Sequence, residues 1–229
     1  MKHLPPALAI LLLLTPPAAA QDFAKGWQAY RSGDVAAALQ EWRPLAEQGD
    51  ADAQFNLGLM YYKGEGVPQD YAQAVKWLRL AATQGHAAAQ NSLGVMYGNG
   101  EGVPQDFAEA VTWYRLAAAL GNANGQFNLG VRYANGDGVA QDFAEAVKWY
   151  RLAAAQGQAN AQHNLGVKYA KGEGVPQDDV LAHMWFNLAA AQGHRSAATN
   201  RGIMAARMTP AQVAEAQQFA RAWLAEHGE

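Results

Sequence analysis

The chain has 229 residues, half of them hydrophobic, and a formal net charge of −3, so it is long enough to bury a core of its own. It has no cysteine, which excludes disulfides, thiolate nucleophiles, cysteine-ligated zinc and iron–sulfur clusters. The basic residues form no stripe or cluster, and this excludes nucleic acid and anionic membrane surfaces as favoured partners.

Residues 1–20 have the organisation of a secretory signal peptide. A short basic start is followed by an apolar run over residues 8–14, a proline-containing break over 15–17 and three alanines over 18–20. The apolar run is shorter than the ~20 residues of a membrane span. We therefore expect cleavage after Ala20, a periplasmic or secreted location, and no membrane insertion of residues 21–229. The alternative is an uncleaved N-terminal anchor.

Residues 21–50 are predicted to form a short, diverged helical repeat. Apolar residues recur at helical spacing over residues 23–30 and 35–47, and Gly33-Asp34 marks a turn between them. Terminal units of a repeat array commonly differ from the internal ones in this way.

Residues 51–196 contain four copies of a 36-residue pattern. The run GEGVPQD at 64–70 returns at 100–106 and 172–178, and as GDGVAQD at 136–142. The same spacing separates four tryptophans, which are Trp77, Trp113, Trp149 and Trp185. Self-similarity at a period of roughly 20–50 residues is typical of solenoids, in which each unit stacks on its neighbours.

Each copy is expected to fold as two helices. In the third copy, Leu129 and Tyr133 lie four residues apart and therefore share one face of the first helix. Asp142 is the expected N-cap of the second helix, and Glu145 completes a capping box with it. Gly157 is expected to end that helix.

The second helix of the third copy is predicted to bury one apolar stripe, whose members are Ala146, Trp149, Leu152 and Ala153. No segment alternates with a period of two, so no β-strand is predicted. The fold class that follows is an all-α solenoid of stacked helix-turn-helix repeats.

Residues 197–229 are predicted to cap the array with helices. Thr209 and Gln212 form a capping box around a proline at the first helical position, which begins a helix that continues to about residue 225. Its expected apolar stripe consists of Val213, Ala216, Phe219, Ala220 and Trp223.

The repeated pattern resembles the Sel-one-like repeat, a relative of the tetratricopeptide repeat with a longer loop between its helices. The residues of the first copy that carry the resemblance are Ala53, Leu57, Gly58, Tyr61, Gly64, Gly66 and Val67. Gly125 replaces the leading alanine in the third copy, and Ala140 replaces the loop proline. The resemblance covers nearly all of residues 21–229. It implies a right-handed superhelix whose first helices line the concave side, and work in protein–protein interaction.

Catalytic and nucleotide-binding motifs are absent from the sequence. It has no HExxH, no GxSxG and no GxxxxGK[ST], and its GxG loops lack the preceding strand of a dinucleotide site. We interpret His86 and His194 as solvated loop residues, and the recurring loop acids as a solvated row. We therefore expect no enzyme activity, no cofactor and no metal site.

First-helix positions that vary between copies are the candidate binding residues. We expect a protein or peptide segment to bind there, with Phe55, Tyr62 and Phe127 as anchors and with the asparagines bonding its backbone. The full set is Phe55, Asn56, Tyr62, Lys63, Asn91, Asn99, Phe127, Asn128, Asn135, His163, Asn164 and Lys171. The alternative is that the asparagines are merely exposed or bind the backbone of the neighbouring repeat.

The sequence thus predicts a non-catalytic scaffold or adaptor of the bacterial cell envelope that binds a protein or peptide. The alternative functions are a regulator or inhibitor of a cell-wall enzyme, and a glycan-binding module in which the same aromatic residues contact cell-wall glycan. A hydrolase is the third hypothesis.

Overall fold

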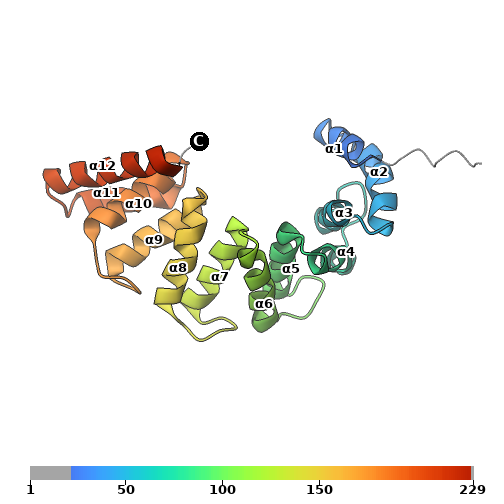
Figure 1. Cartoon of the computed structure of the whole chain (residues 1–229), viewed down its shortest axis with the longest axis horizontal. Helices are drawn as coiled ribbons and strands as arrows, with labels where there is room; N and C mark the ends of the chain where they lie inside the picture. The colour runs from blue at the N-terminus through green and yellow to red at the C-terminus, as the bar shows by residue number, and fades with distance from the viewer. Residues whose placement is uncertain (1–21, 228–229) are drawn as a thin grey trace, which may run out of the picture.

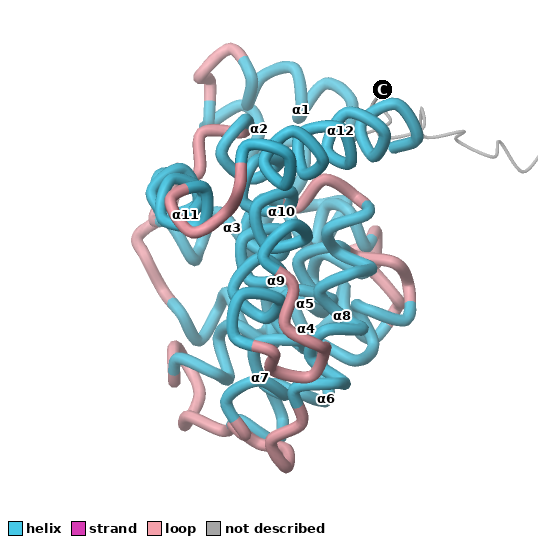
Figure 2. The backbone as a smooth tube through the Cα atoms, turned by 90° about the vertical axis from the view of Figure 1, so that its left-hand side faces the viewer, coloured by secondary structure: helices cyan, strands magenta, loops and turns pink. Residues whose placement is uncertain are grey.

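The computed structural model describes residues 22–227, which form twelve α-helices joined by loops and contain no strand (Figure 2). The helices follow one another along an open arc that has α1 and α12 at its two ends (Figure 1). The all-α solenoid is confirmed, whereas the signal peptide predicted for residues 1–20 lies outside the described residues. Within residues 22–227 no helix has the length and apolar character needed to cross a membrane.

The four repeats contribute two helices each, which we call A and B helices. The A helices are α3 (Ala51–Lys63), α5 (Ala87–Asn99), α7 (Ala123–Asn135) and α9 (Ala159–Lys171). The B helices are α4 (Tyr71–Thr83), α6 (Phe107–Ala119), α8 (Phe143–Ala155) and α10 (Asp179–Ala191). They are preceded by α1 (Phe23–Arg31) and α2 (Val35–Glu47), and followed by α11 (Arg195–Ala205) and α12 (Pro210–His227).

The helix boundaries follow from local capping chemistry. The Asp142 carboxylate accepts the backbone N–H of Glu145, so this N-cap is confirmed. The reciprocal half of the capping box does not form, because the Asp142 N–H donates to the Tyr133 carbonyl at 2.9 Å and the Glu145 carboxylate bonds Lys148. The box at Thr209 and Gln212 is complete.

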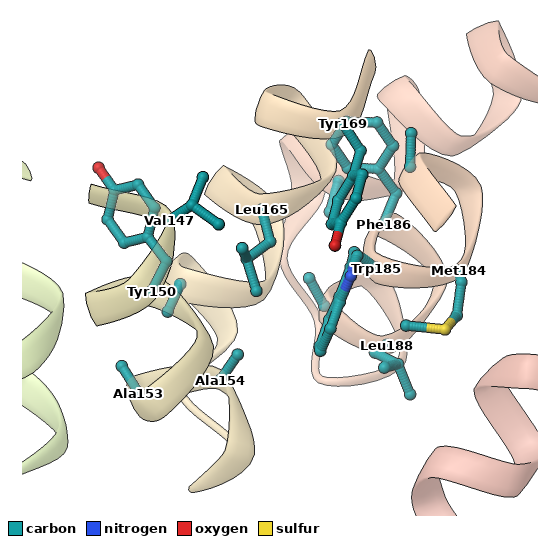
Figure 3. Close-up of a cluster of buried hydrophobic side chains, with 14 of the residues drawn as sticks. Val147, Tyr150, Ala153, Ala154, Leu165, Tyr169, Met184, Trp185, Phe186 and Leu188 are labelled. Atoms are coloured by element: carbon teal, nitrogen blue, oxygen red, sulfur yellow. The ribbon is translucent and has the colours of Figure 1, made fainter. Parts of the chain in front are cut away.

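The buried face of α8 differs from the predicted stripe. Tyr150 and Val147 are buried together with the small residues Ala146, Ala153 and Ala154. Leu152 is 49% exposed, so its place in the stripe was wrong; the helix turns a neighbouring face toward α7 and α9. Figure 3 shows Leu165 of α9 between the α8 side chains and the aromatic residues of α10.

Trp149 is half-buried and packs against the preceding repeat. Its ring lies on the buried cluster that includes Val111, Tyr114 and Ala118 of α6. Trp149 therefore contributes to the stacking of one repeat on the next.

Substitution of Trp149 by alanine should lower the free energy of unfolding by about 3 kcal/mol, the lower end for loss of a packed aromatic side chain. Leu152→Ala, one turn along the same helix, should change it by less than about 0.5 kcal/mol because that side chain is exposed. Urea unfolding of both variants checks this difference. Equal destabilisation by the two substitutions would contradict the packing described for α8.

A row of buried glutamines joins the repeats. Gln54 donates to the Ala46 carbonyl of the preceding helix, and its own carbonyl accepts from Gln84 at 2.8 Å. The third and fourth repeats form the same pairs, Gln126 with Gln156 and Gln162 with Gln192. Sequence reasoning missed this row, although its spacing of 36 is visible in the sequence.

The second repeat breaks the row. Leu120 stands where the other repeats have the second glutamine, and its side chain is 56% exposed. As a result the buried Oε1 of Gln90 finds no hydrogen-bond partner among residues 22–227. A buried acceptor without a donor costs stability.

Leu120→Gln should therefore raise the free energy of unfolding by about 1 kcal/mol, because the new amide can reach Gln90 as in the other repeats. Thermal and urea unfolding measure the gain. Leu116→Gln, which places the same amide one turn earlier on α6, is the control and should give no such gain. A loss of stability in Leu120→Gln would contradict the equivalence of the repeats at this position.

The C-terminal helix covers the last B helix. Trp223 of α12 meets Trp185 of α10 edge-on at 5.8 Å, and Leu188 is only 2% exposed, unlike its equivalent Leu152. Correspondingly, α10 carries Leu181 and Met184 where α8 has Glu145 and Lys148.

Of the predicted α12 stripe, Ala216 and Ala220 are buried and Val213 and Trp223 are half-buried. Phe219 is exposed because α12 turns its alanines toward α10.

Candidate functional site

One face of the molecule presents an aliphatic row along the A helices and α11. A residue at the centre of each helix contributes to it, and the members are Leu59, Val95, Val131, Val167 and Ile203. Two pairs of consecutive helices of this series contact one another directly, α5 with α7 and α9 with α11. We call this surface the A-helix face. Sequence analysis missed the row, although its members recur every 36 residues.

Three clefts lie on the A-helix face. The N-terminal cleft of about 210 Å³ is lined by Trp27, Tyr30, Trp42, Phe55, Asn56, Leu59, Met60 and Lys63. The second cleft of about 120 Å³ is lined by Leu59, Tyr62, Leu78, Asn91, Ser92, Val95 and Met96. The C-terminal cleft of about 210 Å³ is lined by Val167, Ala170, Lys171, Phe186, Asn200, Ile203, Met204 and Arg207.

One position of the A helices carries four of the predicted site residues, and all four are half-buried. They are Phe55, Asn91, Phe127 and His163. Phe55 stacks on the His86 ring with 4.5 Å between centroids, and Phe127 packs against Tyr150 at 6.0 Å. Asn91 accepts a hydrogen bond from Asn128 of the next repeat at 2.9 Å. Of these contacts, only the bond between Asn91 and Asn128 joins consecutive repeats, because Phe127 and Tyr150 belong to the same repeat and His86 ends the repeat of Phe55. Phe55 and Asn91 also line a cleft.

The asparagines predicted to hold a peptide backbone have partners within the chain. Asn56 donates to the Asp52 carbonyl one turn back in its own helix at 2.8 Å. Asn128 donates to Asn91, and Asn164 bonds both the His163 ring and the Tyr150 hydroxyl. The alternative given for these residues, binding to the backbone of the neighbouring repeat, names the right neighbour for Asn128 and Asn164, but the groups that they bond there are side chains. Asn56 also lines the N-terminal cleft.

The predicted site residues in the last turn of each A helix lie beside the loop acids. Lys63 is 3.7 Å from Glu65, and Lys171 is 3.7 Å from Glu173. Asn99 and Asn135 make the equivalent contacts with Glu101 and Asp137, and Tyr62 also bonds Glu101. Burial and this carboxylate raise the pKa of Tyr62.

The loop acids are held by the chain and are not a solvated row. The Tyr30 hydroxyl donates to Glu65 at 2.6 Å, Arg132 pairs with Asp137 at 3.0 Å, and Lys168 pairs with Glu173 at 2.6 Å. The hydrogen bond from Lys168 lowers the pKa of Glu173.

His86 and His194 are N-caps, so the interpretation as solvated loop residues was wrong. Each imidazole Nδ1 accepts the backbone N–H at the third residue of the following A-type helix, at 3.1 Å from Ala89 and 3.2 Å from Ala197. Asp50 caps α3 in the same way, and a histidine ring with a free Nδ1 supplies the same acceptor.

His163 is enclosed at the boundary between the fourth repeat and α11. Its ring stacks on His194 at 4.5 Å, its Nδ1 lies 3.2 Å from Asn164 Oδ1, and its Nε2 lies 3.2 Å from Asn200 Nδ2. These contacts suit a neutral ring with the proton on Nδ1. Burial lowers the pKa of the His163 imidazole, the bond with Asn164 opposes this, and His194 lowers it further.

The chemistry available on this face is recognition. Its clefts combine apolar walls with a few amide and ammonium groups, which can bind side chains and fix their orientation. Within residues 22–227, no group of three histidine, aspartate or glutamate side chains is placed to hold a metal ion.

The His163 contacts predict a pH dependence of stability. Because the folded pKa lies below the ordinary 6.5, the unfolded chain binds a proton more readily, and stability should fall as the pH drops below 6.5. His183, whose pKa is also lowered by burial and by Arg201, adds to this loss. Urea unfolding at pH ~7.5 and ~5.5 measures the dependence.

His163→Asn is the informative variant, because Asn91 at the same position of the second repeat already pairs with an asparagine of the next A helix. This variant should remain folded and lose part of the pH dependence, while His183 supplies the rest. A pH dependence identical to that of the unsubstituted chain would contradict the role given to His163.

Comparison with known proteins agrees with this architecture. The Sel1 repeat family matches residues 51–86, 87–122, 123–158 and 159–194. No curated protein sequence matches the chain. A protective antigen of uropathogenic Escherichia coli with an SLR fold is 46% identical over 74% of this chain and 36% of its own length, with a TM-score of 0.72. The chain therefore spans about a third of that antigen.

Two further structures show the same fold. A Sel1 repeat protein from Oxalobacter formigenes is 38% identical over 78% of this chain and 76% of its own, with a TM-score of 0.69. An immunity protein from Pseudomonas aeruginosa, at 23% identity and a TM-score of 0.52, covers 88% of this chain and 80% of its own, and shows similarity of fold alone.

Sel1 repeats generally form non-catalytic scaffolds that mediate protein–protein interaction. With four matched repeats, two flanking helix pairs and one continuous A-helix face, this chain belongs to the Sel1 repeat family.

Proposed function

We propose that the protein is a non-catalytic scaffold that holds an extended protein segment along its A-helix face. The observation that carries the proposal is the continuous aliphatic row with three clefts beside it. Ile203 in this row is 55% exposed, and its neighbours in the row are partly exposed. A continuous apolar surface with polar margins is typical of protein interaction sites.

Recognition rests on side chains of the partner that enter the clefts. In the N-terminal cleft, Tyr30 and Phe55 offer aromatic walls, and Lys63 lies at the edge. The amides of the face mostly bond one another, so they fix the geometry of the repeats and contribute less to the partner's backbone than the sequence predicted. Affinity then comes from a few buried anchors.

The cell envelope is the proposed location. The signal peptide predicted over residues 1–20 supports a periplasmic or secreted adaptor. The partner would then be an envelope protein, which includes the case of a cell-wall enzyme regulated by binding.

Glycan binding is the second candidate. Trp27 is exposed beside Tyr30 in the N-terminal cleft, with the two rings stacked at 6.0 Å. Exposed aromatic faces of this kind can stack on a sugar ring. Co-sedimentation of the purified protein with cell-wall sacculi, lost in Trp27→Ala, would favour this candidate over a protein partner.

Site-specific photo-crosslinking in the native host tests the scaffold proposal. One crosslinker replaces Ile203 on the A-helix face, and the control replaces Leu152 on a B helix, a side chain of similar size and exposure. A discrete protein crosslinked from position 203 and not from 152, identified by mass spectrometry, is the expected result. Crosslinks from position 152 alone, or from neither position, would contradict the proposal.

A further inference from the structure

The second cleft and the C-terminal cleft are the same site in two repeats. Six lining positions of the second cleft correspond to six of the C-terminal cleft at a constant offset of 108 residues, or three repeats. The pairs are 59 and 167, 62 and 170, 78 and 186, 92 and 200, 95 and 203, and 96 and 204. We propose that the two clefts bind the two ends of one acidic peptide segment, each through an apolar side chain. This inference rests on the proposed function.

The intervening repeats close the corresponding space with polar side chains. Tyr114 occupies the position of Leu78 and bonds Arg132, which stands where the second cleft has Met96. Tyr150 occupies the same position one repeat later and bonds Asn164. The hydroxyl groups thus tie each B helix to the next A helix at the middle of the face.

The two ends remain open because their side chains lack these polar groups. Leu78 and Phe186 carry no hydroxyl, and Met96 and Met204 replace the cations of the middle repeats. The walls that result are aliphatic, thioether and aromatic, so the fitting group is an aliphatic or aromatic side chain.

Cations accompany the clefts at both ends. Lys63 and Lys171 share one position in the last turn of α3 and α9, where the middle repeats have Asn99 and Asn135. Arg207 occupies the equivalent position just after α11 and is paired with Asp179 at 2.8 Å. The salt bridges of Lys63 and Lys171 are long, at 3.7 Å, and both ammonium groups are exposed. Their neighbouring acids Glu65 and Glu173 are already engaged at 2.6 Å by Tyr30 and Lys168.

The two exposed lysines favour an acidic segment. Exposed lysines with weak partners can exchange them for carboxylates of a ligand at little cost. The hydrogen bond that the Lys63 ammonium donates to the Tyr30 hydroxyl raises the pKa of Lys63, so this side chain stays charged. An acidic residue beside each apolar anchor therefore complements both ends of the face.

A single segment that fills both clefts gains affinity by linkage. The two clefts are lined by equivalent positions three repeats apart, and Val131 of the aliphatic row stands between them in the chain. Once one anchor is bound, the second is held at high effective concentration, which increases affinity by about 10²–10⁴-fold over one anchor.

Selection of peptides of ~20 residues from a random displayed library against residues 21–229 tests the inference, with Kd values from fluorescence anisotropy. We expect enriched peptides with two apolar anchors at a constant separation, each beside aspartate or glutamate. Each half-peptide should bind at least about 10²-fold more weakly. Binding should also weaken as ionic strength rises from ~0.05 to ~0.5 M.

Variants that close each cleft provide the structural control. Leu78→Tyr with Met96→Arg copies the closed arrangement of Tyr114 and Arg132, and Ile203→Glu places a carboxylate at the open C-terminal cleft. Each should weaken binding at least about tenfold, and Leu152→Glu on a B helix should leave it unchanged. Circular dichroism confirms that each variant is folded.

Half-peptides that bind as tightly as the whole, or an unchanged Kd in Ile203→Glu, would overturn the two-anchor inference and leave the scaffold proposal standing. A library that yields no binder would contradict both.

Discussion

The stability of each repeat and the shape of the whole array depend on contacts between one repeat and the next. A pair of 13-residue helices has apolar surface on more faces than it can bury by itself, so each repeat is stable only when its neighbour covers the remainder. Trp149 lies against the preceding B helix, and Gln162 donates to the Ala154 carbonyl of the repeat before it. Tyr169 accepts a further bond from Arg151 of that repeat. The arc in Figure 1 is the sum of these contacts.

The same requirement shapes the surface available for binding. Side chains that join repeats, such as Tyr114 and Tyr150, close the middle of the A-helix face, whereas Leu78 and Phe186 leave its ends open. In such an array, a cleft is therefore expected where the side chain of one repeat differs from those at the equivalent position of the other repeats. The binding face consists of the side chains on the A helices that remain exposed after the repeats have packed against one another.

Sequence alone predicted the helices and their ends because these follow from local signals, such as the Asp142 N-cap and Gly157 after α8. It failed where a side chain's partner lies one repeat away. Asn128 was predicted to bond the backbone of a bound peptide, but it bonds Asn91, 37 residues earlier. Leu152 was wrongly included in the buried stripe of α8. It is exposed whereas the adjacent Ala153 is buried, because consecutive helix positions face different neighbours. The buried glutamines were overlooked because polar residues on a helix usually face solvent.

Native-state hydrogen exchange tests most directly whether contacts between repeats set the stability of the array. The glutamine pair is missing within the second repeat, where the Oε1 of Gln90 has no donor although its Nε2 still bonds the Ala82 carbonyl, so α5 and α6 are joined by one hydrogen bond fewer than α7 and α8. We expect amides of α5 and α6 to exchange through an opening of lower free energy than those of α7–α10. One common opening free energy for all the helices, or a weakest opening within α7–α10, would contradict this dependence.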